Sequence, residues 1–304
     1  MRWEKLGLVP APGGTPPWAL HSALTPTPVL HQSGCIRVYA SFRDGRGIGR
    51  IGFVDLDPDS PTRVLRISKT PALDIGRPGS FDDNGVILGD VLEDGGTLLL
   101  FYVGFQLTSK VKFLAFSGMA RSEDGGDNFR RISEAPVLDR SDEGLLFRAI
   151  HSVRKDAGRW KIWYGAGSTW TLIEDTPYPT YQVFQMESQT LESLPRTGRL
   201  VISYEGREYR IGRPRVYAVN CGYMMLYTKG SLDKSYLPGM AVSSDGVSWK
   251  RCDSEVGISP SPEGWDSRTV CYPSLLDLPD GRTLMFYNGN DMGREGFGVA
   301  MRRD

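Results

Sequence analysis

The pattern of apolar and polar positions repeats five times along the chain. Each repeat contains an apolar, strand-prone run that ends in a tyrosine and is followed by a small or polar turn: IRVYASFRD, LLFYVGFQ, KIWYGAGS, MMLYTKGS and LMFYNGND. The spacings between the tyrosines are 63, 62, 63 and 60 residues, at positions Tyr39, Tyr102, Tyr164, Tyr227 and Tyr287. A period this regular indicates a repeat architecture.

Three further strand-like segments accompany each tyrosine strand. One precedes it across a tight-turn sequence such as EDGG or LPDG, one follows it, and a fourth is visible in the first four repeats. The fifth repeat lacks a fourth strand, whereas WEKLGLVPAP at residues 3–12 has the composition of the fourth strands elsewhere. We therefore predict an all-β, five-bladed β-propeller with four-stranded antiparallel blades, in which the N-terminal strand joins the last blade and closes the ring.

This architecture predicts a single domain over residues 1–304. An ordinary β-sandwich is the alternative, because it also contains many short strands, but it explains neither the regular period nor the complementary chain ends. No segment has convincing helical periodicity with caps, so we expect few and short helices.

Composition narrows the choice of partner and compartment. Lysine plus arginine equals aspartate plus glutamate at 36 each, so no global field favours nucleic acid or a membrane surface. No apolar run approaches the roughly 20 residues that span a bilayer, and MRWEKLGLVPAPGG lacks the apolar core of a signal peptide. The four cysteines have no CxxC spacing, and we interpret them as buried free thiols in a cytoplasmic protein.

The predicted ring indicates where a ligand site would form. First strands line the central channel of a propeller, and the loops leading into them share a face with the loops after the tyrosine strands. FDDNGV and WDSRTV share a pattern that contains Asp82 and Asp266, which is typical of a structural role, so Asp83 and Asp90 are the better catalytic candidates. The binding candidates on the same face are Arg43, Asp44, Arg148, His151, Arg213, Arg215, Arg268 and Tyr272.

The arginines among these candidates favour an anionic ligand. A guanidinium group matches a carboxylate or phosphate, so several arginines around one funnel indicate such a group in the substrate. The alternative is that each arginine pairs with a neighbouring aspartate and only braces the fold. His151 has two interpretations as well, as a proton-transferring or substrate-binding group and as a satisfied core histidine. Tyr272, Trp170 and Trp265 could offer apolar platforms for a sugar face.

The five-fold rhythm, the stretch CYPSLLDLPDGRTLMFYNGND and the sequence FDDNGV resemble the five-bladed β-propeller glycoside hydrolases. This broad group includes arabinanases, invertases and mannoside phosphorylases, and the chain resembles a divergent member. The resemblance implies three carboxylates on the funnel floor, and it places Asp90 at the supporting aspartate. Leu24, Thr25 and Pro26 stand where the first acid is expected, and Arg148 stands where the general-acid glutamate is expected. Glu143, five residues upstream of Arg148, is therefore the candidate general acid.

Two main functions remain open at this stage. The first is a glycosidase-like enzyme that cleaves or transfers the glycosidic bond of a carboxylated or phosphorylated sugar, with phosphorolysis as a variant. The second is a propeller that binds a charged glycan or sugar nucleotide without catalysis, since fold does not fix function. A protein-interaction propeller is a weaker third reading. No glycine-rich phosphate loop or histidine–cysteine cluster indicates a cofactor or a metal, although loop aspartates leave calcium possible.

Overall fold

The computed structural model describes residues 1–14 and 16–303 and consists almost entirely of antiparallel strands. The all-β prediction is confirmed. The few helices are short, as expected: the 3₁₀ turns η1 (Pro17–Ala19) and η2 (Asp253–Glu255) and the single turn α1 (Asn290–Gly293). No helix in the described part of the chain is long and apolar enough to cross a membrane.

Strand pairing divides the chain into successive sets of four, each paired in an antiparallel manner from inside to outside. The first set forms its own sheet and contains β2 (His21–Leu30), β3 (Ile36–Arg43), β4 (Gly49–Leu56) and β5 (Val64–Ile67). The next is β6 (Val86–Asp94), β7 (Thr97–Leu107), β8 (Phe113–Ser122) and β9 (Arg130–Arg131). The third is β10 (Phe147–Asp156), β11 (Arg159–Ile173), β12 (Thr176–Ser188) and β13 (Arg199–Ile202).

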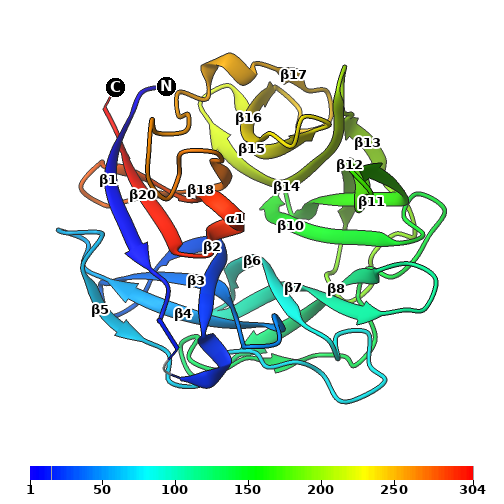
Figure 1. Cartoon of the computed structure of the whole chain (residues 1–304), viewed down its shortest axis with the longest axis horizontal. Helices are drawn as coiled ribbons and strands as arrows, with labels where there is room; N and C mark the ends of the chain where they lie inside the picture. The colour runs from blue at the N-terminus through cyan, green and yellow to red at the C-terminus, as the bar shows by residue number, and fades with distance from the viewer. Residues whose placement is uncertain (15, 304) are drawn as a thin grey trace.

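The fourth set is β14 (Glu208–Val219), β15 (Gly222–Ser231), β16 (Tyr236–Ser243) and β17 (Lys250–Arg251). Short parallel contacts between β8 and β10, and between β12 and β14, join the second, third and fourth sets into one twelve-stranded sheet. The last sheet contains β18 (Cys271–Asp277), β19 (Thr283–Asn288), β20 (Gly296–Arg302) and β1 (Trp3–Pro10). Because β1 pairs with β20, the two chain ends lie side by side (Figure 1).

The sets are arranged around a common centre, with β2, β6, β10 and β14 lying innermost (Figure 1). Apolar clusters fill the spaces between adjacent sets. One cluster joins Tyr39 of β3 to Leu88 of β6, and another joins Val38 of β3 to Phe286 of β19, so the first set packs on both the second and the last. This packing follows from the alternation of apolar residues along each strand, which gives every sheet two faces to bury.

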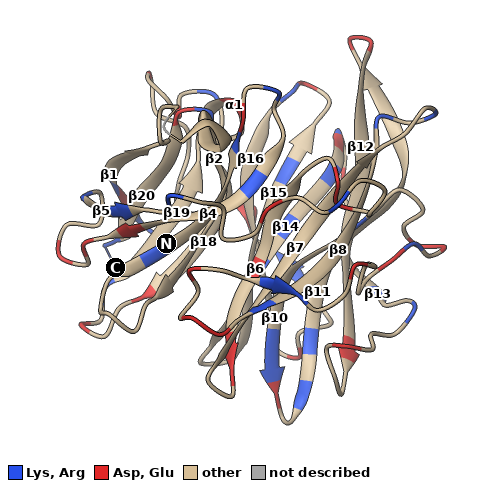
Figure 2. Cartoon of the chain, turned by 90° about the horizontal axis from the view of Figure 1, so that it is seen from below, with Lys and Arg blue, Asp and Glu red and all other residues tan. Residues whose placement is uncertain are grey.

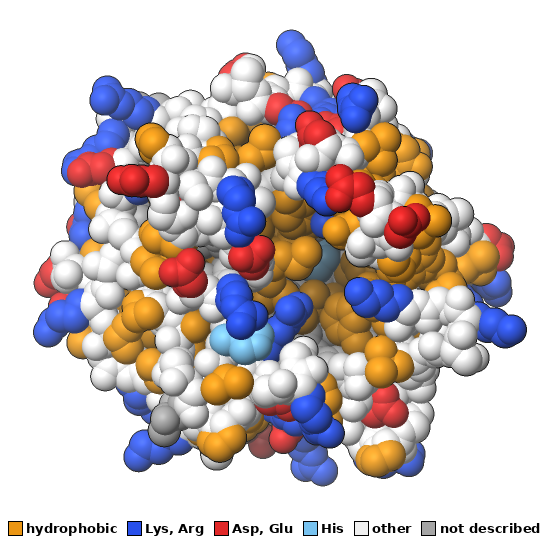
Figure 3. All heavy atoms as spheres, in the orientation of Figure 1, with side chains coloured by type: hydrophobic (Ala, Val, Ile, Leu, Met, Phe, Trp, Pro, Cys, Tyr) orange, Lys and Arg blue, Asp and Glu red, His pale blue; other side chains and the backbone are white. Residues whose placement is uncertain are grey.

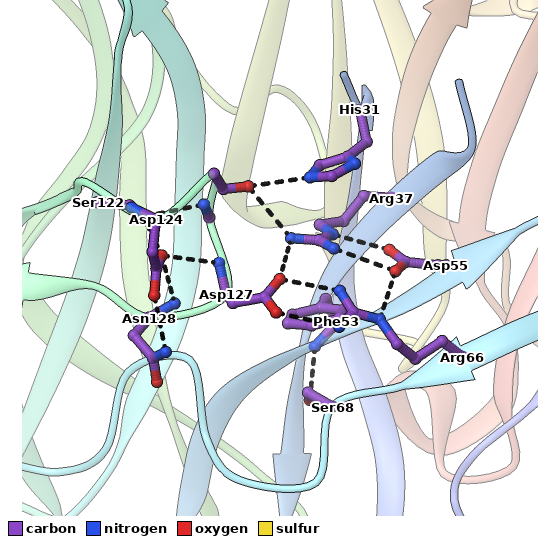
Figure 4. A network of polar contacts seen from close by, with 12 residues as sticks. His31, Arg37, Phe53, Asp55, Arg66, Ser68, Ser122, Asp124, Asp127 and Asn128 are labelled. Carbon is purple, nitrogen blue, oxygen red and sulfur yellow. Dashed lines mark hydrogen bonds and ion pairs between the residues drawn. The ribbon is translucent and has the colours of Figure 1, made fainter. Parts of the chain in front are cut away.

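A partly buried polar network joins the first set to the loop between β8 and β9 of the second (Figure 4). The guanidinium group of Arg37 is fully buried, contacts Asp55 and Asp127 at 2.7 Å each, and lies 3.9 Å from the ring centroid of Phe53. Such a charge is tolerated inside a protein only when it is paired and hydrogen-bonded. Arg66 completes the network by contacting the same two carboxylates.

The cysteines need one correction. In the structure, Cys35 and Cys271 are buried free thiols as predicted, but Cys221 is exposed and Cys252 is half-buried. Cys221 lies in the tight turn between β14 and β15, where the backbone faces solvent.

Candidate functional site

The innermost strand of each set contains an irregularity at an equivalent position. The antiparallel register between the first and second strands is interrupted at Thr25, Gly89, His151, Arg213 and Tyr272. At Thr25, Arg213 and Tyr272 the interruption also includes the proline that follows. These positions recur with the rhythm of the tyrosines. A bulge turns a side chain out of the regular alternation, so each of these residues can be aimed differently from its strand neighbours.

Three of the bulge residues have a backbone conformation that ordinary residues avoid. Thr25, Arg213 and Tyr272 have φ angles of 57°, 52° and 56°, and each precedes a proline. Left-handed backbone is unfavourable for a residue with a side chain, and the α conformations are also disfavoured before proline. Strain of this kind is retained at positions that the surrounding structure fixes, which is typical of ligand sites.

A cavity of about 520 Å³ opens beside these bulges at the centre of the molecule. Figure 3 shows the hollow, with hydrophobic walls and basic side chains around it. Four bulge residues line it, Thr25, His151, Arg213 and Tyr272, and Arg43 lines it as well. The aromatic part of its wall comprises Phe105, Phe113, Phe147, Trp170, Tyr178 and Tyr181. Of the sequence-predicted binding residues, the cavity therefore brings together Arg43, His151, Arg213 and Tyr272.

The charges around this cavity have one sign. Its lining includes Arg43, Lys112, Arg210 and Arg213, but within residues 1–14 and 16–303 it includes no aspartate or glutamate. His151 is only 4% exposed, and burial, together with the charges of Arg213 and Arg215, holds its pKa well below the ordinary value. The imidazole is therefore neutral near pH 7 and can accept or donate a hydrogen bond.

Arg213 lines the cavity and ties its own strand, β14, to the innermost strands β2 and β6. Its Nη2 donates to Thr25 O at 3.0 Å and Thr27 Oγ1 at 2.7 Å, and its Nη1 donates to Leu88 O at 3.0 Å. Burial, followed by the charge of Arg215, lowers its pKa to about 9, so the group is still charged at neutral pH. Its partners are carbonyl and hydroxyl oxygens, which leave its net charge uncompensated.

Two predicted arginines are paired with predicted acids. Arg215 contacts Asp90, and Arg148 contacts Glu143. Asp90 also accepts the backbone N–H groups of Val91 and Val153. Arg148 and Arg215 thus show the structural bracing that the sequence left as an alternative, and neither lines the cavity.

The remaining predicted residues lie on loops outside the cavity lining. Asp83 accepts the backbone N–H of Gly79 at 2.8 Å, which fixes the turn that leads into β6. Asp44 contacts Arg50 at 2.8 Å and caps its own turn, and Arg268 forms an exposed pair with Asp291 at 2.9 Å. The structure therefore does not bring Asp83, Asp90 and Glu143 together in one cavity.

Glu143 takes part in an arrangement that recurs from set to set. Its carboxylate accepts a hydrogen bond from the hydroxyl of Tyr164 and forms an ion pair with Arg148. In the fourth set Asp253 accepts the hydroxyl of Tyr227 and contacts Lys229, and in the last set Asp266 accepts the hydroxyl of Tyr287 at 3.0 Å and contacts Lys5 at 2.6 Å. This tyrosine–acid–base contact gives the tyrosines of the third, fourth and last sets a structural role, whereas the hydroxyl of Tyr39 donates to Gly126 O at 2.8 Å.

Sequence reasoning missed the residues that give the cavity its character. Arg210 lies in β14 before the bulge at Arg213. Tyr178 and Tyr181 belong to the long hairpin of β11 and β12, which rises above its neighbours with an acidic tip (Figure 2). The extra length of this hairpin, visible in the sequence as an apolar and aromatic stretch before the fourth strand, was the available signal. The resulting site can hold an anionic group against aromatic surfaces.

Comparison with known proteins places this fold in a class. A solved structure described as a glycoside hydrolase superimposes with a TM-score of 0.76 at 18% identity, covering 99% of this chain and 91% of that one. A structure from the GH130 family of mannoside phosphorylases, which contains glycoside hydrolases that target β-1,2 mannosidic linkages in Candida mannan, gives 0.70 at 15% identity, covering 99% and 95%. The predicted resemblance to these proteins is confirmed at the level of the fold.

No protein-family model matches the chain. It is 32% identical over 303 residues to the uncharacterized protein Rv1502 of Mycobacterium tuberculosis (strain H37Rv), covering 99% of both sequences. The chain belongs to the same family as that protein.

Proposed function

We propose that this protein binds a carbohydrate bearing an anionic group in its central cavity and acts on a glycosidic bond of that carbohydrate. The observation that carries the proposal is the composition of the cavity wall: arginine and lysine side chains with aromatic rings, and no acid among the described lining residues. A neutral sugar would not require the buried cations Arg210 and Arg213, because burying a positive charge is costly without a negative partner.

The binding half of the proposal rests on specific groups. The indole N–H of Trp170 is buried without a partner in the described structure, and the Nδ1 atom of His151 is likewise unpaired. Both atoms belong to residues that line the cavity. Buried polar atoms are normally satisfied, so we assign them to the hydroxyl groups of a bound sugar.

The catalytic half rests on the fold shared with glycoside hydrolases and on Asp83, Asp90 and Glu143 as candidate acids. Hydrolysis needs two carboxyl groups on either side of the glycosidic bond. Asp90 is connected to the cavity, because its partner Arg215 also donates to the backbone oxygen of His151 at 2.9 Å. Phosphorolysis is the variant in which the cationic wall receives inorganic phosphate and one proton donor suffices.

Binding without catalysis is the second candidate function. It is favoured by the ion pairs that already engage Asp90 and Glu143, because a carboxylate held by an arginine is a poor general acid.

We further infer that the successive sets of four strands are five blades of one closed propeller over residues 1–304. The pairing of β1 with β20 and the packing of the first set on the last support this inference.

Matched glycoside pairs test the proposed function. Each pair consists of a uronide or sugar phosphate and the neutral glycoside of the same configuration, with and without inorganic phosphate. We expect saturable binding of anionic members by calorimetry and released sugar by mass spectrometry, with release abolished in Asp90→Asn. Binding without any product would select the second candidate, and preference for the neutral members would refute the anionic substrate.

A further inference from the structure

Arg210 occupies a row of side chains that runs across four neighbouring strands. On one side, Arg210 of β14 pairs with Gly230 of β15, and Gly230 pairs with Tyr236 of β16. On the other side, Arg210 pairs with Tyr181 of β12. Residues paired in this way across strands have side chains in contact on one face of the sheet. The register therefore places Arg210 between two tyrosines.

Tyrosine rings surround the guanidinium group of Arg210. Its central carbon lies 4.5 Å from the ring centroid of Tyr236, 5.0 Å from that of Tyr209, 5.6 Å from that of Tyr178 and 5.9 Å from that of Tyr181. Aromatic faces attract a cation but do not accept its N–H groups as an oxygen does. The tyrosines thus hold the group in place and leave its hydrogen-bonding capacity unused.

Arg210 differs from the other deeply buried arginines in lacking an oxygen partner. Arg37, Arg148 and Arg215 contact carboxylates, and Arg213 donates to carbonyl oxygens. Arg210 is 7% exposed, its Nε atom is buried without a partner, and no ion pair engages it within the described residues. An unpaired buried guanidinium is costly, and it lines the cavity.

The backbone around Arg210 is shaped to accommodate it. A Cβ atom at Gly230 would lie 2.8 Å from Nε and 3.0 Å from Cγ of Arg210, and 3.2 Å from Cδ2 of Tyr236. A Cβ atom at Gly212 would lie 2.6 Å from Cε2 of Tyr181. Glycine at these two positions leaves the space that the arginine and its flanking tyrosine fill, so the arrangement is a built site.

We propose that Arg210 and its surrounding tyrosines form the subsite for the carboxylate of a sugar acid, which rests on the proposed function and specifies its substrate class. The Nε atom of Arg210 is enclosed, so the Nη1 and Nη2 groups are the ones available to a planar, singly charged carboxylate, which a guanidinium group can bind through two parallel hydrogen bonds. A phosphate group carries more charge and a tetrahedral shape, and it is better served by several cations. The site therefore selects uronic-acid-like sugars over sugar phosphates.

The test uses acetate as the minimal carboxylate, so that it does not depend on knowing the sugar. The probe is the Nε–H signal of Arg210 in protein labelled with ¹⁵N-arginine, assigned by its absence from the Arg210→Lys variant. We expect acetate to shift this signal saturably, inorganic phosphate at equal ionic strength to shift it less, and the Arg37 signal to stay unchanged. An unshifted Arg210 signal, or tighter saturation by phosphate, would overturn the proposal.

Gly230→Ala provides a second variant that keeps the arginine but displaces it. Acetate affinity should fall about tenfold or more, as expected when a charge-assisted hydrogen bond is lost. Gly45→Ala controls for the loss of a glycine, because a Cβ atom there would make only an ordinary contact at 3.7 Å, with Cδ2 of Leu20. Unchanged acetate affinity in a folded Gly230→Ala protein would contradict the subsite. If glycosides bind but acetate does not shift Arg210, the subsite fails alone; if acetate binds and no glycoside does, the proposed function fails alone.

Discussion

Glu143 offers the sharpest contrast between a catalytic and a structural role. The side chains of Glu143 and Arg148 are 10% and 2% exposed, and the carboxylate also accepts the Tyr164 hydroxyl and the backbone N–H of Gly198 at 3.0 Å. Glu143→Gln removes the charge and keeps the shape, which leaves the Arg148 guanidinium buried beside a neutral group. Removing one partner of a buried ion pair costs about 3 kcal/mol or more.

This cost is measurable, because natural proteins are stable by only about 5–15 kcal/mol. We expect Glu143→Gln to lower the free energy of unfolding by about 3 kcal/mol in urea titrations, with a fall in Tm of roughly 6 °C or more. Adding Arg148→Met to it should recover part of the loss, because the unpaired charge is then removed as well.

Asp266→Asn is the matched control, since Asp266 has the same contacts with Tyr287 and with Lys5. Its effect should be smaller, because the Lys5 side chain is 27% exposed and water can solvate it. A Glu143→Gln protein with wild-type stability and no turnover would refute the structural role and support the general acid implied by the family resemblance.

Three further predictions concern the rest of the molecule. Because the pKa of folded His151 is depressed, the unfolded chain takes up its proton first; stability should fall as pH drops below about 6.5, by up to about 1.4 kcal/mol per pH unit. The slope of urea-derived stability against pH should therefore be shallower in His151→Gln, and an equal slope would refute the assignment. Arg37→Met leaves Asp55 and Asp127 with only the half-exposed Arg66 as a cation, and it should cost about 1–3 kcal/mol; a change below about 0.5 kcal/mol, usual for surface substitutions, would contradict the network. Deleting residues 1–10 exposes the β20 edge and should produce self-association in sedimentation, whereas a monomer of unchanged Tm would refute the role of β1.

The regular part of the fold could be read from the sequence because it follows from local patterns. Apolar alternation ending at Tyr102 or Tyr227 marks a strand wherever it occurs, and the spacing of such runs is a property of the chain alone. The placement of β1 beside β20 followed from composition, since residues 3–12 resemble the fourth strands. The very short β9 and β17 show the limit of this approach, because the longer fourth strands expected there are paired over only two residues.

The site was harder to predict because its character depends on pairing between distant residues. Arg213 and Arg210 are both arginines of β14, yet one is held by carbonyl oxygens of β2 and β6 and the other lies among tyrosines. The proline after Arg213 marks that residue locally, but no local pattern shows which partners either arginine finds. Likewise, the sequence predicted Asp90 and Glu143 as candidate acids of the funnel. Only the structure shows that Arg215 pairs with Asp90 and that Arg148 pairs with Glu143.

The central claim is that the cavity recognises a negatively charged sugar. Calorimetric titration of the wild-type protein and of Arg210→Lys with matched pairs of uronides and neutral glycosides tests it most directly. We expect a uronide to bind the wild-type protein at least about tenfold more tightly than its neutral counterpart, and we expect Arg210→Lys to lose this preference. Equal affinity for the two members of every pair that binds, or a preference that survives in Arg210→Lys, would contradict it.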